Sequence, residues 1–156
     1  MSMMQEAINR SGMSTQEFAE SVNYSKDAVY KAIQGRRRIP SDAKGHLSKL
    51  NIMGGLAVAH EATGYCIFSI SNKDRHPQNL IRRMEKEDRE ADEALKDIPY
   101  LIIDATTAAD LSPQAKETAR KAMMEVADRI RADLDLLVEM DHRYKLGVIE
   151  YLIKKN

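Results

Sequence analysis

The sequence predicts an all-α protein with an N-terminal five-helix domain (1–64), a connector (65–76) and a helical domain (77–156) containing one long helix. Two observations support this prediction. The composition is rich in Met, Ala, Leu, Ile, Lys and Glu and contains no tryptophan, which favours helices over sheets. Apolar residues also recur at helical spacing between residues that typically start and stop helices. A chain of 156 residues suffices for one domain or two small ones.

The N-terminal domain is predicted to begin with a short helix over residues 3–11, followed by two helices joined by a tight turn. Ser14 and Glu17 match a capping box, in which each residue satisfies a free N–H group of the other. Asn23 lies where the chain must turn sharply, and asparagine tolerates a left-handed backbone better than most residues. Ser25 is the expected N-cap of the third helix.

The third helix is expected to end at Gly35, and Pro40 prevents an early restart. Ser41 is the expected cap of a fourth helix, and residues 52–63 are predicted to form a fifth. The stretch YCIFSIS (65–71) has a strand-like composition, but no second candidate strand is evident as a partner. We therefore favour a connector there over a short strand.

The second half begins with a predicted helix from Pro77 to about Lys96. The stretch IPYLIIDATTAADL (98–111) is expected to form another helical segment, too apolar to be left in water. Ser112 and Pro113 are a strong start signal for a helix of 30 residues or more. Met123 and Met124 are expected to fill an irregular helical core, with an adaptable protein-binding surface as the alternative.

Such a long helix usually packs against a partner or a second copy of the chain. The stripe expected to make a homodimer contact consists of Val126, Ile130, Leu134 and Leu137.

The net charge is formally zero but is unevenly distributed. Residues 1–75 carry ten Lys and Arg against seven Asp and Glu, and residues 76–156 carry fourteen against seventeen. The excess of positive charge in the first half includes Arg36, Arg37 and Arg38 in succession, a pattern compatible with a polyanionic partner. No apolar run approaches the roughly 20 residues of a membrane-spanning helix, so a cytoplasmic protein is expected.

The order helix, tight turn, helix over residues 14–34 has the dimensions of a helix-turn-helix. The stretch TQEFAESVNYSKDAVYKAIQGRRRIP resembles the DNA-binding domain of the Cro/CI-type (XRE-like) phage and bacterial regulators. Members typically read T-Q-x-x-[LVF]-A, then a turn, then a helix that begins with Ser or Thr and ends in G-[RK]-x-x-P. One departure is Asn23, where the family usually has glycine. The matching positions are Thr15, Gln16, Phe18, Ala19, Ser25, Val29, Ile33, Gly35, Arg36 and Pro40.

The resemblance implies a DNA interface centred on the third helix. Ser25 would begin this recognition helix, and the outward residues Lys26, Asp27, Tyr30 and Lys31 would face the major groove. Thr15 and Gln16 would donate to backbone phosphates at the start of the preceding helix. Arg36, Arg37 and Arg38 would neutralise phosphates and supply salt-dependent affinity. As alternatives, the arginine run is a solvated loop and the charged residues are ordinary surface groups, with Asp27 favouring the helix dipole.

Other chemistry has little support in the sequence. The four histidines, His46, His60, His76 and His142, are scattered without metal-ligand spacing, and no phosphate-binding glycine loop or nucleophile motif is present. We therefore expect no enzyme activity, no cofactor and no metal site. The single cysteine, Cys66, excludes an internal disulfide, and its apolar neighbours predict a buried thiol.

Two functions from different classes remain at this stage. The first is a sequence-specific transcriptional regulator, most simply a phage-type or mobile-element repressor that binds double-stranded DNA as a homodimer. The second is a protein-interaction module, for example an inhibitor of a host or defence protein, whose helix-turn-helix domain regulates its own promoter. The operator, the direction of regulation and any inducing ligand are not specified by the sequence.

Overall fold

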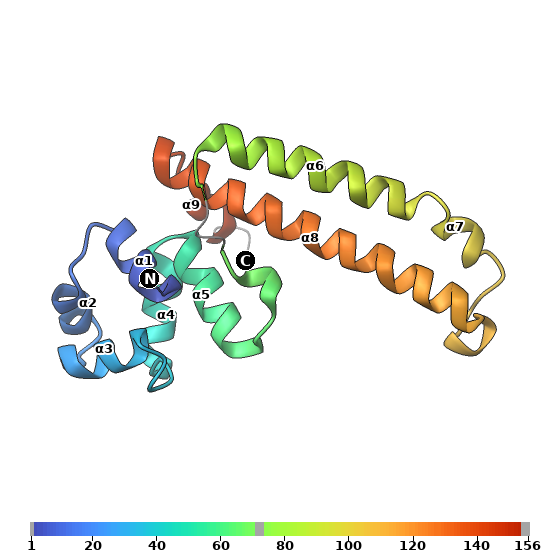
Figure 1. Cartoon of the computed structure of the whole chain (residues 1–156). Helices are drawn as coiled ribbons and strands as arrows, with labels where there is room; N and C mark the ends of the chain where they lie inside the picture. Colours follow the sequence, from blue (N-terminus) through green and yellow to red (C-terminus); the bar gives the residue numbers. More distant parts are fainter. Residues whose placement is uncertain (1, 71–73, 154–156) are drawn as a thin grey trace. The chain divides into compact units, whose positions relative to one another are not determined.

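The computed structural model describes residues 2–70 and 74–153, and these residues form helices joined by loops, with no strand. The predicted all-α fold class is confirmed (Figure 1). In the part of the chain described, no helix has both the length and the apolar character that crossing a membrane requires. The elements in chain order are α1 (Met3–Arg10), α2 (Thr15–Ser21), α3 (Lys26–Ile33), α4 (Ser41–Leu50), α5 (Ile52–Thr63), η1 (Cys66–Phe68), α6 (Pro77–Leu95), α7 (Ile98–Leu101), η2 (Ala108–Asp110), α8 (Pro113–Tyr144) and α9 (Val148–Ile153).

The chain divides into two compact units. The first contains residues 2–70 together with 138–153, and the second contains residues 74–137. This division differs from the predicted boundaries, because the end of α8 and all of α9 group with the N-terminal helices. The reason is local packing: Val138 is buried, and Glu139 accepts a hydrogen bond of 3.0 Å from Nη2 of Arg10 in α1.

The first unit has a continuous apolar core. Helices α1, α4 and α5 pack together, and α2 and α3 pack against each other. At the contact of α4 with α5, a Cβ on Gly54 would clash with the backbone carbonyl of Leu47, so only glycine permits this close approach. The buried apolar residues are Met4, Ala7, Ile8, Phe18, Ala19, Val22, Val29, Ala32, Ile39, Ala43, Leu47, Ile52, Met53, Leu56, Ala57, Ile70 and Val138.

The second unit is a helical hairpin. Figure 1 shows α6 and α8 running side by side, joined by the segment that contains α7 and η2. Nη1 of Arg83 lies 2.7 Å from Oδ2 of Asp135, and Nη1 of Arg129 lies 3.4 Å from Oδ1 of Asp92. The first pair joins the start of α6 to the later part of α8. The second joins the end of α6 to an earlier part of α8, so the two helices are antiparallel.

Apolar packing in the hairpin is thin. Its buried residues in the described range are Pro77, Leu80, Ala91, Ala122, Ala132 and Asp135. Small side chains therefore form most of the contact, and a carboxylate that is 1% exposed lies within it.

Three local predictions are corrected here. The 98–111 segment is not one helix: it forms only the short α7 and η2, and it leaves Tyr100 and Ile103 77% and 75% exposed. Met123 and Met124 are also exposed rather than packed in a core. Cys66 is exposed rather than buried. Its apolar neighbours contact the fold instead: residues 67–69 are half-buried and Ile70 is buried.

Candidate nucleic-acid interface

The start of α2 is fixed by the predicted capping box. Oγ of Ser14 accepts a hydrogen bond of 3.2 Å from the Glu17 N–H, and the Glu17 carboxylate accepts one of 2.6 Å from the Ser14 N–H. The backbone hydrogen bond from Ser14 lowers the pKa of Glu17, and the Ser14 side chain lowers it further. This prediction from the S-x-x-E pattern is confirmed.

The turn between α2 and α3 has the left-handed backbone expected at Asn23, whose φ is 56°. The following N–H, that of Tyr24, donates to the carbonyl oxygen of Ala19 at 2.9 Å, closing the end of α2. Oγ of Ser25 then accepts a hydrogen bond of 3.2 Å from the Ala28 N–H, which makes Ser25 the N-cap of α3 as predicted. Caps on both sides of the turn thus hold α3 in a defined position relative to α2.

Apolar side chains hold the two helices together. Phe18 and Ala19 of α2 and Val29 of α3 are buried, and Ile33 is half-buried. The centroid of the Phe18 ring also lies 5.9 Å from that of the His46 ring, so α4 contributes a contact to the same core. A rigid core behind α3 is what a recognition helix requires, because base contacts depend on the angle at which the helix is presented.

The outward face of α3 carries the predicted contact residues. Lys26, Asp27, Tyr30 and Lys31 are all exposed. Nζ of Lys31 lies 2.6 Å from Oδ2 of Asp27, and Nζ of Lys26 lies 5.8 Å from the centroid of the Tyr30 ring. The aspartate and one lysine therefore neutralise each other on the free protein, while the other lysine keeps its charge over an aromatic face.

The arginine run lies directly after α3. Gly35, with φ of 70°, ends the helix, and the N–H groups of Arg36 and Arg37 donate to the Lys31 carbonyl oxygen at 2.9 and 3.2 Å. Ile39 is buried and anchors the far end of the loop. Within residues 2–70 and 74–153, the exposed guanidinium groups of Arg36 to Arg38 form no ion pair with a carboxylate, so three positive charges remain unmatched on a backbone that is tied down.

The residues predicted to contact DNA at the helix starts differ in how exposed their side chains are and in which contacts they already make. Thr15 is 8% exposed, and its hydroxyl oxygen accepts a hydrogen bond of 3.3 Å from Nε2 of Gln5. This contact gives its hydroxyl a role inside the fold rather than on a phosphate. Gln16 is exposed and donates to Glu20 at 2.6 Å. Ser25 is exposed, and its hydroxyl hydrogen is left to donate while its oxygen caps α3.

One exposed residue on the same side was missed by the sequence analysis. Gln34, the C-cap of α3, lies four positions after Tyr30 and is exposed. Residues four apart share a helix face, so this spacing was the available signal. A glutamine amide can donate to and accept from an adenine edge.

The stripe predicted for dimerisation is partly open. Ile130 is 42% exposed, and Val126, Leu134 and Leu137 are half-buried. They lie on α8 at spacings of four, four and three residues, which keeps them on one side of the helix. The hairpin therefore presents apolar surface beside its thin core.

The sequence analysis did not anticipate a cluster of three carboxylates in the hairpin. Oxygens of Glu87, Glu90 and Glu125 lie within 4.8 Å of one another. Nζ of Lys86 lies 2.6 Å from Glu90 and 3.4 Å from Glu87, and the hydrogen bond to Glu90 raises the pKa of Lys86. The ammonium group offsets much of the repulsion in this cluster.

Comparisons of the chain with protein-family models, with curated proteins and with solved structures found no match. The resemblance to the Cro/CI-type regulators is thus carried by the residues of the 14–40 stretch alone.

Proposed function

We propose that this protein is a double-stranded DNA-binding transcriptional regulator that binds its operator as a homodimer. The observation that carries the proposal is the position of three unmatched arginines, Arg36 to Arg38, directly behind a capped helix with a polar outer face. A groove-reading helix and a phosphate-binding cluster on one rigid support are the two parts that specific DNA binding needs.

The contact residues have separate roles in this proposal. Lys26, Tyr30 and Gln34 extend along the exposed face of α3 and would meet base edges in the major groove. Lys31 would exchange its ion pair with Asp27 for a base or phosphate contact, leaving the aspartate to accept from cytosine. The arginines would add sequence-independent affinity.

The homodimer would form through the hairpin. Two helical hairpins that pack along the stripe of Val126, Ile130, Leu134 and Leu137 would make a four-helix bundle and bury that stripe. A dimer is expected because a single helix-turn-helix reads only a few base pairs, whereas two copies read half-sites about 34 Å apart.

The test is binding to duplex fragments that carry the DNA upstream of the protein's own gene, measured by fluorescence anisotropy over a range of salt concentrations. Replacing Arg36, Arg37 and Arg38 with alanine should weaken binding to every fragment. The slope of log K against log[salt] should become less steep by about 3. Replacing Lys26 or Lys31 should instead change which fragment is preferred.

A matched control removes the same charge elsewhere. Lys116, Arg120 and Lys121 are exposed on α8, and their triple alanine variant should leave affinity and salt slope unchanged. Equal losses in both triple variants would show that the effect is one of net charge alone. Absence of binding to any duplex in dilute buffer would refute the proposal.

A second candidate function is favoured by exposed apolar residues in the segment that joins α6 to α8. Tyr100, Ile102 and Ile103 are exposed there, and a cluster of this kind is typical of protein-binding surfaces. In that case the chain captures another protein, and its helix-turn-helix regulates its own promoter. Replacing all three residues with serine should then abolish capture of that protein, while operator binding and dimerisation persist.

A further inference from the structure

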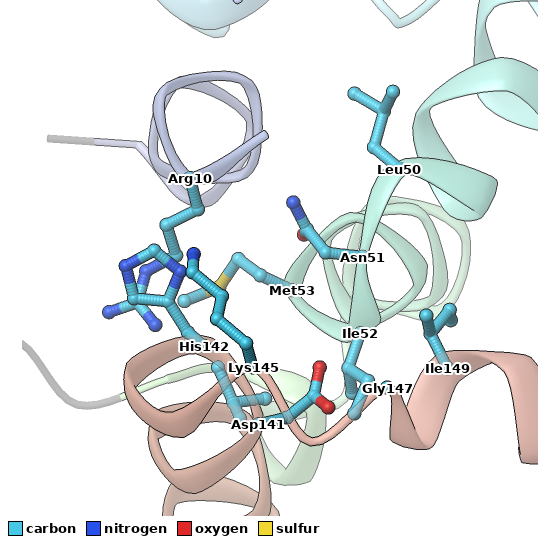
Figure 2. A pocket seen from close by; sticks show the side chains of 11 residues that line it. Arg10, Leu50, Asn51, Ile52, Met53, Asp141, His142, Lys145, Gly147 and Ile149 are labelled. Atoms are coloured by element: carbon cyan, nitrogen blue, oxygen red, sulfur yellow. The ribbon is translucent and has the colours of Figure 1, made fainter. Parts of the chain in front are cut away.

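Two cavities of the first unit differ in their lining. The smaller, of about 230 Å³, lies among the end of α1, the junction of α4 with α5, the end of α8 and the start of α9. Figure 2 shows Asp141 in its wall together with Arg10, His142 and Lys145, so a charged ligand of either sign would meet a like charge there. The larger cavity, of about 500 Å³, lies directly beside the arginine run that follows α3.

The lining of the larger cavity joins the candidate DNA interface to the core of the first unit. The end of α3 and the loop after it supply one part of the lining, including Arg37 and Arg38. The start of α1, the later part of α5 and residues 69–70 supply the rest. The apolar residues of the lining are Met3, Met4, Ala32, Ile33, Ile39, Ala57 and Ile70.

Charged side chains also line this cavity, but they offer little to a charged ligand. Oε2 of Glu61 lies 2.7 Å from Nζ of Lys44, so these two charges offset each other. Arg37 and Arg38 are exposed, and their guanidinium groups are therefore hydrated. A charged ligand would lose its own hydration on entering the apolar lining, and an exposed guanidinium returns little of that cost. The lining therefore favours a neutral, apolar ligand.

The volume indicates the size of such a ligand. An apolar cavity of about 150 Å³ accepts benzene, so 500 Å³ has room for about three aromatic rings. Met3 and Ile33 are only half-buried, which leaves part of each side chain accessible to a ligand. The flexible thioether of methionine also adapts well to the edge of a ring.

We propose that this cavity binds a neutral molecule of two or three aromatic rings, and that the bound ligand lowers the affinity of the protein for DNA. The rings would pack on Met3, Ile33 and Ile39. The ligand would thus act as an inducer that releases the operator.

The effect on DNA would be transmitted by the side chains of Arg37 and Arg38. The backbone on both sides of them is held, since the Arg37 N–H donates to the Lys31 carbonyl oxygen at 3.2 Å and Ile39 is buried. The long apolar stems of the two arginines can fold over an apolar ligand, which draws their guanidinium groups away from phosphates. This effect rests on the proposed DNA binding, whereas occupancy of the cavity does not.

Two dyes with the same three-ring skeleton test the class of ligand on the full-length protein. N-phenylnaphthylamine is neutral, and anilinonaphthalene sulfonate adds an anionic group; both become fluorescent in an apolar site. The neutral dye should bind, and the sulfonate should bind about tenfold more weakly because it must lose its hydration. No binding of the neutral dye, or an affinity for the sulfonate that equals or exceeds it, would overturn the proposal.

Variants of Met3 locate the site. Met3→Trp should fill the cavity and abolish binding of the neutral dye, with Met123→Trp, exposed on α8, as its matched control. Met3→Gln keeps the length of the side chain and should weaken the dye about fivefold, because its amide would face a ring without a partner. Circular dichroism establishes folding, and unaltered dye affinity in folded Met3 variants would overturn the assignment of the site.

The effect on DNA is measured by the anisotropy of an upstream duplex that carries a red fluorophore. Saturating neutral dye should weaken duplex binding about fivefold, and the duplex should weaken dye binding by the same factor. The slope of log K against log[salt] should become less steep by about 2, because two arginines leave the phosphates. Met3→Gln should bind the duplex normally and require more dye for the same effect.

The outcomes separate this inference from the proposed function. Dye binding without any change in duplex affinity would overturn the inducer role. A protein that binds the dye but no duplex would refute the DNA-binding function, and the inducer role with it, while the ligand site in the cavity would stand.

Discussion

The two units of this chain differ in the size and kind of side chains that they bury. Residues 2–70 enclose large apolar side chains such as Phe18, Ile8 and Leu47, each fully buried. The hairpin of 74–137 encloses mainly alanine and an aspartate, and it leaves Ile130, Met123 and Tyr100 in solvent. Burial of apolar surface is the main favourable term in folding, so the first unit has its own source of stability and the second lacks much of it. The proposed homodimer contact would bury part of the apolar surface that the hairpin leaves open.

The largest expected effect tests the self-sufficient unit. Phe18→Ala should lower the free energy of unfolding of the first unit by about 3–5 kcal/mol, because it removes a fully buried ring and leaves a cavity behind α3. Amide hydrogen exchange should show lost protection in α2 and α3 with little change in α6. Comparable loss in α6 would mean that the two units unfold together, contrary to the comparison.

The next prediction tests the incomplete unit. Ile130→Glu should raise the dissociation constant of the homodimer at least about a hundredfold, since a carboxylate would be buried without a partner in the bundle. In a monomer the same side chain is exposed and the substitution should have little effect. Sedimentation equilibrium measures the constant, and Thr118→Glu, exposed earlier on α8, is the control. A protein that is monomeric before substitution would remove the homodimer from the proposal.

A smaller effect concerns the ion pair inside the hairpin. Arg83→Met should destabilise the hairpin by about 1–3 kcal/mol, because the 1%-exposed carboxylate of Asp135 loses its ion pair with Arg83 at 2.7 Å. The double variant Arg83→Met, Asp135→Leu should recover most of the loss, since neither charge then remains. Urea unfolding at several protein concentrations provides both values. Failure of the double variant to recover would mean that Asp135 contributes through other contacts.

The sequence predicted best where local chemistry decides the structure. The capping box of Ser14 and Glu17, the left-handed Asn23 and the N-cap Ser25 were all predicted correctly, because each depends on residues only a few positions apart. Ser41 was not the cap of its helix: Pro40 occupies that position, and no side chain caps α4. Proline supplies the extended conformation there without a hydroxyl.

Features that depend on distant contacts were not predictable in the same way. Arg10 and Glu139 are far apart in sequence, and nothing local indicates that they pair or that the end of α8 joins the first unit. The exposure of Tyr100 and Ile103 also contradicts the usual behaviour of an apolar stretch. Of the candidate DNA interface, the exposed face of α3 followed from helical spacing. The burial of Thr15 did not, because it depends on Gln5 in another helix.

The smallest effect returns to the turn that presents α3. Asn23 is exposed with φ of 56°, so its side chain contributes little packing and its backbone conformation decides the outcome. Asn23→Ala should lower the free energy of unfolding by about 1 kcal/mol, because alanine has a steric penalty in this region. Asn23→Gly should change it by less than about 0.5 kcal/mol, since glycine has no such penalty but a more flexible unfolded chain. Thermal unfolding of both variants gives the difference, and equal losses would show that the asparagine side chain, rather than its backbone, stabilises the turn.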